Sequence, residues 1–386
     1  MKKKVLPALI VTGLIILVVI IMGITALINK YTPTKKTEDL KEYFNISSDD
    51  EAALIVDNEL SDYKAKIIDD KVYVDYRFVH DSLNSRFYWD ANENVLLYTT
   101  ASDIISAAAD SNSYSVTKQT NDFGYPIVKA TSDSALIALD YVKQYSNITF
   151  KSYDDPARVV ITSKWDEIDS ATVSKSTQVR VKGGIKSPIL KQVKKNDTLT
   201  ILDSGDKWDK VATEDGIIGY IKSKAMSESK KTKLTNPDYE EETFTHIKKD
   251  KDICLAWNQV TSRSANSKVA QVISSTKGIN VMSPTWFYLN DNNGNLADIA
   301  SKDYVSYCHS QGIEVWGLFS NFENTDVDAA YVLTHTSTRT TLINQIMSAA
   351  FNYELDGVNI DFENITEAAY GDSYIEFIRE LAIKCH

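Results

Sequence analysis

The chain has 386 residues, a length that suggests two to four domains. Its composition, 43% hydrophobic and 25% charged, is ordinary for a globular protein. The net charge of −11 argues against a nucleic-acid partner, because such binding needs clustered Lys and Arg. The cysteines, Cys254, Cys308 and Cys385, are odd in number and widely spaced, and the five histidines are scattered. We therefore predict no disulfide framework, no metal site and no cofactor.

The first 30 residues predict a membrane signal anchor. Residues 5–28 form an apolar run long enough to cross a bilayer as a helix, and three lysines precede it. The run is longer than the apolar region of a cleavable signal peptide, and no clear cleavage site follows. The leading lysines place the N-terminus in the cytoplasm and the bulk of the chain outside, facing the cell wall, although Lys30, Lys35 and Lys36 reduce the asymmetry. Residues 31–50 are polar and predict a stalk.

Residues 51–165 contain an internal duplication of an α+β pattern. The first copy has strands at 72–76, 87–90 and 95–98 and a helix around 78–83; the second has strands at 127–130, 148–152 and 159–162 and a helix around 135–145. The turns at 90–93 and 153–156 are rich in turn-forming residues. This pattern resembles the copper amine oxidase N-terminal-like domain of bacterial wall proteins, which implies no copper despite its name. We predict a noncatalytic spacer or wall-interaction module.

Residues 170–228 change to short alternating runs, which predict a small all-β barrel. Trp208 and the segment 216–221 resemble the bacterial SH3-like domain, a family that often binds wall peptide or glycan. Trp208 is then either a platform for a ligand or a core residue of the barrel, and the core position is favoured. Residues 229–251 are charged, have little hydrophobicity and predict a linker.

From residue 252 the pattern changes to strands that alternate with helices. Candidate strands lie at 253–260, 279–289, 313–320 and 355–363, with helical patterns at 303–308 and 340–351. Apolar strands separated by helices predict a parallel sheet with crossover connections. Gly312 is expected to end the helix that precedes it.

The strand at 355–363 carries the clearest chemical signal. It alternates three apolar residues, Val358, Ile360 and Phe362, with three polar ones, Asn359, Asp361 and Glu363. This period turns the polar side chains to one face, where burying two carboxylates and an amide costs several kcal/mol unless they bond each other or a ligand. A general acid near neutral pH needs a raised pKa, which a neighbouring carboxylate and partial burial provide. We predict that Glu363 is this acid and that Asp361 pairs with it; the alternatives are a solvated strand end or an acidic metal site.

Residues 356–363 resemble the DGxDxDxE motif of family 18 glycoside hydrolases, which are chitinase-like enzymes with a (β/α)8 TIM barrel. The segments 281–287, 315–321 and 377–381 add to the resemblance, which runs from about residue 252 to residue 386. Asn359 stands where the family usually has an acid. That substitution is similar to the branch of spore-cortex and peptidoglycan N-acetylglucosaminidases.

The resemblance implies a role for each residue of the motif. Glu363 protonates the glycosidic oxygen, and Asp361 holds the substrate's N-acetyl group, whose carbonyl oxygen attacks the anomeric carbon. The configuration is then retained through an oxazolinium ion, an exception to the usual two-carboxylate scheme. Asp356 and Asn359 are supporting residues: Asp356 faces away from the polar trio by strand parity, and Asn359 can hydrogen-bond Asp361 but carries no charge.

Trp257, Trp286 and Trp316 are candidates for stacking on sugar rings, with packing inside the barrel at least as strongly favoured. A TIM barrel needs eight units and about 250 residues, whereas residues 252–386 hold four strands. We therefore expect a fragment of a longer multidomain protein: a transmembrane helix, an α+β module, an SH3-like barrel and about four βα units of a TIM barrel. Two functions remain open. One is an anchored enzyme that cleaves β-1,4 bonds in N-acetylglucosamine-containing wall glycan (peptidoglycan or chitin-like), with activity expected of the complete protein; the other is a noncatalytic wall-binding protein.

Overall fold

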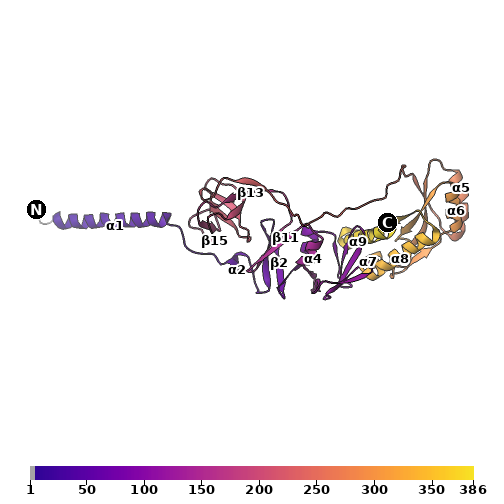
Figure 1. Cartoon of the computed structure of the whole chain (residues 1–386), viewed down its shortest axis with the longest axis horizontal. Coiled ribbons are helices and arrows are strands. Elements are labelled where there is room, and N and C mark those ends of the chain that lie inside the picture. Colours follow the sequence, from indigo (N-terminus) through magenta and orange to yellow (C-terminus); the bar gives the residue numbers. More distant parts are fainter. Residues whose placement is uncertain (1–4) are drawn as a thin grey trace. The chain divides into compact units, whose positions relative to one another are not determined.

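The structure, a computed structural model, describes residues 5–386 and divides into two compact units (Figure 1). The first unit comprises Met1–Tyr73 and Tyr145–Glu240, and the second comprises Val74–Gln144 and Glu241–His386. The chain is multidomain and mixes helices with several sheets, as the sequence predicts. The units do not follow the segments suggested by sequence patterns, since residues 74–144 group with residues 241–386.

Helix α1 (Val5–Tyr31) opens the first unit. Its stretch Leu9–Tyr31 has a mean hydropathy of 2.9, and none of it is buried against the rest of the protein. A helix of this length and composition can cross a bilayer, and a signal sequence near the N-terminus has the same character. The apolar helix is thus confirmed, and its insertion into a membrane stays a prediction.

The segment after α1 was expected to be a stalk but is packed onto the first unit. The Thr34 N–H donates to Ile185 O at 2.8 Å, and the Ile189 N–H donates to Lys36 O at 2.9 Å. The short helix α2 (Leu40–Tyr43) follows, and Phe44 is only 1% exposed. The segment packs onto the unit because it carries a few apolar side chains among its polar ones. Burying one aromatic ring stabilises the folded state by about 1.5–3 kcal/mol.

A mainly antiparallel sheet forms one part of the first unit. The strands of this seven-stranded sheet that lie in or begin in the first unit are β1 (Glu51–Val56), β2 (Glu59–Ile68), β3 (Lys71–Asp75), β11 (Thr149–Tyr153) and β12 (Arg158–Thr162). They run in the order β11, β12, β1, β2 and β3, with β1 parallel to β12. Strands β11 and β12 form the hairpin predicted for the second copy of the duplication.

A seven-stranded antiparallel sheet follows in the region predicted as an SH3-like barrel. Its elements are β13 (Glu167–Thr172), β14 (Thr177–Arg180), β15 (Ile189–Val193), β16 (Thr198–Asp203), β17 (Trp208–Ala212), β18 (Ile218–Lys222), the 3-10 helix Ser223–Ala225 and β19 (Lys230–Lys233). The order is β15, β14, β18, β17, β16, β13 and β19. Trp208 is only half-buried, and Lys222 Nζ lies 5.8 Å from its ring centroid, so the indole is not a core side chain.

The second unit begins with a five-stranded antiparallel sheet, β4 to β8 in sequence order. The strands of this sheet are β4 (Phe87–Asp90), β5 (Val95–Thr99), β6 (Ile104–Ala108), β7 (Ser113–Val116) and β8 (Gln119–Asp122). The elements before it are α3 (Tyr76–Phe78) and a π-helix (Val79–Leu83), and those after it are β9 (Val128–Ala130), β10 (Ala135–Ala138) and α4 (Leu139–Gln144). The helix predicted at 135–145 is therefore too long at its start. Residues 135–138 pair with β9 as a strand, because tertiary pairing overrides a helical pattern.

A parallel sheet forms the other part of the second unit. Its elements are β20 (Leu255–Asn258), the 3-10 helix Arg263–Lys268, α5 (Val269–Ser274), β21 (Val281–Leu289), β22 (Leu296–Asp298), α6 (Lys302–Ser310), β23 (Glu314–Ser320), α7 (Ala329–Thr334), α8 (Thr336–Tyr353), β24 (Gly357–Asp361) and α9 (Glu367–Cys385). Strands β20, β21, β23 and β24 are parallel neighbours in that order. All four predicted strands are confirmed. Gly312 follows α6 with φ of 71°, as expected of a glycine that ends a helix.

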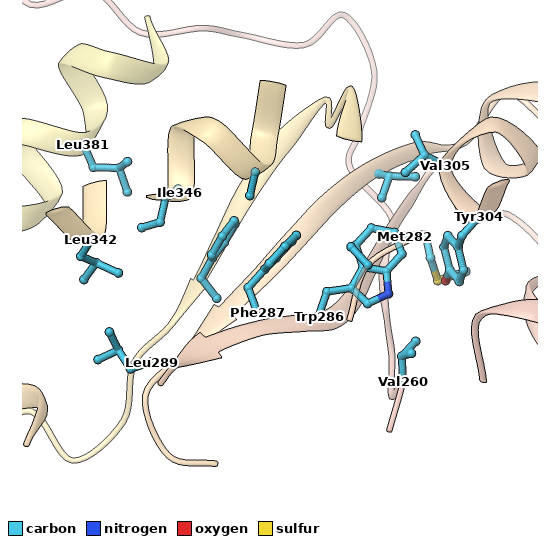
Figure 2. Packing of buried hydrophobic residues seen from close by; sticks show 14 of the residues in the cluster. Val260, Met282, Trp286, Phe287, Leu289, Tyr304, Val305, Leu342, Ile346 and Leu381 are labelled. Carbon is cyan, nitrogen blue, oxygen red and sulfur yellow. The ribbon is translucent and has the colours of Figure 1, made fainter. Parts of the chain in front are cut away.

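The core of the second unit lies between the parallel strands and their helices (Figure 2). Phe287 on β21 stacks on Phe319 of β23, with ring centroids 4.6 Å apart. Leu342 and Ile346 of α8 and Leu381 of α9 belong to the same cluster. Most of these side chains are almost fully buried, so this packing fixes the strand ends that carry the predicted site.

The turn between β4 and β5 caps helix α8. Asp90, 1% exposed, accepts hydrogen bonds from the N–H and Oγ1 of Thr336, both at 2.6 Å. Glu93 accepts from the Ser337 N–H at 3.1 Å. Helix α8 has no side-chain cap from its own preceding residue, so these carboxylates satisfy its N-terminal amides and complement its dipole.

A buried ion pair lies beside this cap. The Arg339 guanidinium, fully buried, donates through Nε to Glu380 Oε1 at 3.0 Å and lies 5.0 Å from the ring centroid of Tyr88. Burial raises the pKa of Glu380 to about 7, against the opposing effect of Arg339. Thr99 of β5 also donates to Glu376 of α9. Strands β4 and β5 are therefore a structural part of the second unit.

Candidate functional site

Strand β24 has the two-faced pattern that its sequence predicts. Val358, Ile360 and Phe362 pack against the apolar cluster of the unit. The Phe362 ring stacks on Phe377 of α9, with centroids 5.5 Å apart and an interplanar angle of 15°. The apolar face of the strand is thus covered by helices, and the intervening residues face the other side of the sheet.

The opposite face of the parallel sheet carries a polar row. Asn359 and Asp361 pair in register with Leu318 and Ser320 of β23. Asn359 Nδ2 donates to Ser283 Oγ at 3.0 Å, and Ser320 Oγ donates to Glu323 Oε2 at 2.6 Å. Ser283 and Ser320 are fully buried, and Asp361 is half-buried. The row therefore joins three neighbouring strands, and Ser320 and Asp361 lie at the carboxyl ends of theirs, where parallel α/β folds place their sites.

Glu363 lies directly after β24 and is exposed. Its backbone is held by Asn321, which follows β23: the Glu363 N–H donates to Asn321 Oδ1 at 2.8 Å, and Asn321 Nδ2 donates to Glu363 O at 3.0 Å. The next residue, Asn364, adopts a left-handed conformation with φ of 59°. Asn321 thus fixes the point at which the candidate acid leaves the sheet. Sequence reasoning did not assign this role to Asn321. The only signal was that Asn321 follows a predicted strand at the same edge of the sheet as Glu363.

Asp356 lies outside the polar row. Its Oδ2 accepts from His309 Nε2 and from the Val315 N–H, both at 2.8 Å. These bonds tie the start of β24 to α6 and to β23. Burial, with a smaller effect from the charge of Asp356, raises the pKa of the Cys308 thiol to about 12.

This environment predicts a difference in reactivity among the three cysteines. Cys254 and Cys385 are exposed, whereas Cys308 is buried and stays a protonated thiol at pH 8. We expect a chromogenic disulfide reagent to modify Cys254 quickly under native conditions, Cys385 more slowly because burial raises the pKa of its thiol, and Cys308 only in denaturant. Mass spectrometry of the native reaction should identify the unmodified residue as Cys308. Fast native labelling of all three thiols would contradict the packing around α6.

The three candidate tryptophans occupy different environments. Trp257 on β20 is 71% exposed and pairs in register with Ser283, which places it on the polar face. Trp316 on β23 is half-buried, and its Nε1 donates to Glu314 Oε2 at 3.1 Å. A Cβ on Gly357 would lie 3.0 Å from its ring, so the glycine leaves room for the indole against β24.

Trp286 has no surface to offer a sugar. It is fully buried, and its Nε1 donates to Asn266 Oδ1 at 2.8 Å. Its ring packs edge-on against Tyr304 of α6, with centroids 4.9 Å apart (Figure 2). Of the two interpretations of this residue, packing between strand and helix is the one that the structure supports.

The second unit also contains a tyrosine with a raised pKa and a cavity. Burial, together with the charge of Asp361, raises the pKa of the Tyr374 hydroxyl on α9, which keeps it protonated. A cavity of about 320 Å³ lies near β22 and α8, lined in part by Phe287, Asp298 and Tyr353. None of the predicted site residues lines this cavity. Among the residues that the structure describes, no cluster of His, Cys, Asp and Glu is arranged to hold a metal ion.

The comparisons with known proteins agree with two of the sequence resemblances. Residues 175–227 match the bacterial SH3 domain family, and residues 55–162 match the copper amine oxidase N-terminal domain family. No curated protein matches the chain. The chain therefore contains an SH3-like domain within a multidomain α/β protein.

Several solved structures are similar to part of the chain. The C-terminal domain of a putative chitinase from Desulfitobacterium hafniense has 22% identity and a TM-score of 0.29, over 33% of this chain and 41% of that one. A chitinase from Chromobacterium violaceum has 17% identity and a TM-score of 0.28, over 33% and 40%. The spore cortex-lytic enzyme SleL from Bacillus megaterium has 18% identity and a TM-score of 0.29, over 34% and 32%. The chain thus spans about two fifths or less of the length of these structures.

Proposed function

We propose that the parallel-sheet segment belongs to a retaining glycoside hydrolase that cleaves β-1,4 bonds in N-acetylglucosamine-containing wall glycan. One observation carries the proposal: Asn359 and Asp361 share the polar face at the carboxyl end of a parallel strand, and Glu363 follows immediately. Asp361 is half-buried on that face, where it can hold a substrate group, and Glu363 lies exposed at the strand end, where its side chain can reach a glycosidic oxygen. The segment then supplies four strands of a family 18 barrel, and the activity is proposed for the closed barrel.

The proposed reaction assigns one step to each carboxyl group. Glu363 gives its proton to the glycosidic oxygen as the bond to the anomeric carbon breaks, and the acetamido oxygen of the same sugar attacks that carbon. Asp361 holds the acetamido N–H and stabilises the positive charge of the oxazolinium ion. Glu363 then takes a proton from the water that opens the ion, which restores the acid and retains the configuration.

The remaining site residues have supporting roles. Asn359, held by Ser283, orients the polar row, and Asp356 fixes the start of the strand through His309 and Val315. Trp257 is exposed on the polar face and Trp316 is half-buried there, so both are proposed sugar contacts. We further propose that α1 spans the cell membrane with the rest of the chain on the wall side, and that the SH3-like domain contacts the wall.

The acetamido group provides the test of this mechanism. Chitin oligosaccharides and peptidoglycan glycan strands should release new reducing ends, and de-N-acetylated strands of the same length should not. Proton NMR of the first product should show the β-anomer, because the configuration is retained. Equal rates on both kinds of strand would exclude assistance by the substrate.

The alternative function is noncatalytic wall binding through the SH3-like domain and the α+β module. It is favoured if the closed-barrel protein sediments with peptidoglycan sacculi and releases no reducing ends from them. Binding that is equal for wild type and for a Glu363→Gln variant, with cleavage by neither, would establish it.

A further inference from the structure

The SH3-like barrel is joined directly to the end of α1. Lys186, in the loop between β14 and β15, donates through Nζ to Thr32 O at 2.8 Å and also to Asn29 O in the last turn of the helix. Arg180, 3% exposed, donates to Thr34 O at 3.3 Å. After the helix, Thr37 forms an isolated parallel β-bridge with Ile189 of β15. These contacts leave no free tether between helix and barrel.

The short connection limits how far the barrel can lie from the end of the helix. Only Thr32 and Pro33 separate Tyr31, the last residue of α1, from Thr34 on the barrel. Three extended residues span roughly 10 Å. If α1 crosses the membrane, as proposed above, this end of the barrel lies at the bilayer surface, within about one Debye length of the headgroups.

The end of the barrel that faces α1 is basic. The loop between β14 and β15 lies at this end, because it follows Arg180. The start of β17 lies beside that loop, since a Cβ on Gly183 would lie 3.2 Å from Trp208 Cβ. The lysines at this end are Lys182, Lys186, Lys207 and Lys222, against two exposed carboxylates, Asp203 and Asp206. Residues 175–227 hold eleven Lys and Arg against six Asp and Glu, although the whole chain carries −11.

Trp208 lies among these lysines. It is half-buried, with Lys222 Nζ 5.8 Å from its ring centroid. Tryptophan beside lysine is the pairing that favours the headgroup region of a bilayer, because the indole is apolar with one polar edge and the ammonium attracts lipid phosphate. The same arrangement suits an anionic wall polymer less well, since the contacts to α1 turn this end of the barrel toward the membrane.

We propose that this end of the SH3-like barrel binds the anionic phospholipid headgroups of the membrane that α1 enters. Lys182, Lys207 and Lys222 supply the charge, and Trp208 lies at the headgroup level. Lys186 positions the barrel through its bonds to the helix end. The barrel would then be a membrane-surface module.

The test uses the full chain in nanodiscs and reads distance to headgroups, independently of hydrolysis. Cys254 and Cys385 are changed to serine, and a fluorophore is attached through Gly184→Cys, where a Cβ has no heavy atom within 4 Å. A second label, through the exposed Lys195→Cys, marks the opposite end of the barrel. Lipids with a nitroxide on the headgroup act as quenchers. In nanodiscs containing phosphatidylglycerol we expect at least twofold stronger quenching at residue 184 than at residue 195.

Charge variants decide between binding and simple tethering. The triple change Lys182→Gln, Lys207→Gln and Lys222→Gln should remove most of the quenching at residue 184. The matched triple at the other end, Lys175→Gln, Lys194→Gln and Lys195→Gln, should leave it unchanged. Quenching that is equal in neutral phosphatidylcholine, or insensitive to the first triple, overturns the proposal. Displacement by a soluble anionic wall polymer at constant ionic strength assigns the surface to the wall and also overturns it.

Discussion

Replacing Glu363 with glutamine is expected to lower the hydrolysis of N-acetylglucosamine-containing glycan by at least about a hundredfold, the usual contribution of a general acid. The amide keeps the size and the backbone bonds to Asn321 but has no proton to give to the leaving oxygen. Substrate binding should change little, because the side chain acts in the transition state. The measurement is release of reducing ends by the closed-barrel protein, with kcat and KM determined separately.

A matched control separates chemistry from charge. Asp326, also exposed and beyond the end of β23, is changed to asparagine, which removes one negative charge outside the polar row. This variant should keep the wild-type kcat. A substrate with a good leaving group, such as an aryl glycoside, should suffer much less from Glu363→Gln, because it needs little protonation. A variant that retains full activity on natural glycan would remove Glu363 from the mechanism.

Replacing Asp90 with alanine is expected to destabilise the second unit by about 3 kcal/mol. The carboxylate accepts four hydrogen bonds, two from the amides of Asn92 and Glu93 in its own turn and two from Thr336 at the start of α8. Removing a helix cap costs about 1 kcal/mol, and leaving buried donors unsatisfied costs about 1–3 kcal/mol more. Urea denaturation followed by tryptophan fluorescence measures the change.

The cap is tested as a contact between distant segments by a double-mutant cycle. Thr336→Ala removes the hydroxyl partner alone and should cost less than Asp90→Ala. Together the two changes should cost clearly less than the sum of the single losses, because both remove the same contact. Asp133→Ala, at an exposed site in the same unit, serves as the control and should be neutral. Strictly additive losses would mean that the turn does not hold the helix.

The parallel sheet could be predicted because its signals are local. Each strand is a short apolar run between helical patterns, and the period of β24 alone separates Asn359 and Asp361 from Val358 and Ile360. The antiparallel sheet β4 to β8 was predicted only in part. Strand β8 is polar on both faces, with residues such as Asn121, and the alternation in β7 covers only four residues, so neither strand has a clear signal.

Contacts between segments far apart in the sequence could not be predicted. Asp90 was predicted at the start of a turn, and it does begin the turn between β4 and β5. Its partner Thr336 is 246 residues away, and no local pattern in either segment indicates the pairing. Phe44 shows the same limit, because one apolar ring in a polar stretch indicates neither burial nor a partner. In the candidate site, Asn321 and Ser283 are common polar residues, and only the fold shows that they hold Glu363 and Asn359.

The discontinuity of the second unit has a consequence for biogenesis. During synthesis, residues 74–144 emerge before the whole of 145–240, and their partners in α8 and α9 come later still. Until then Asp90 has no helix to cap, and Tyr88 has no guanidinium against its ring. The SH3-like barrel, whose strands are nearly contiguous, can fold as soon as it emerges. The segment 74–144 therefore lacks these contacts until α8 and α9 have been synthesised, which leaves part of its surface exposed to chaperones or to aggregation.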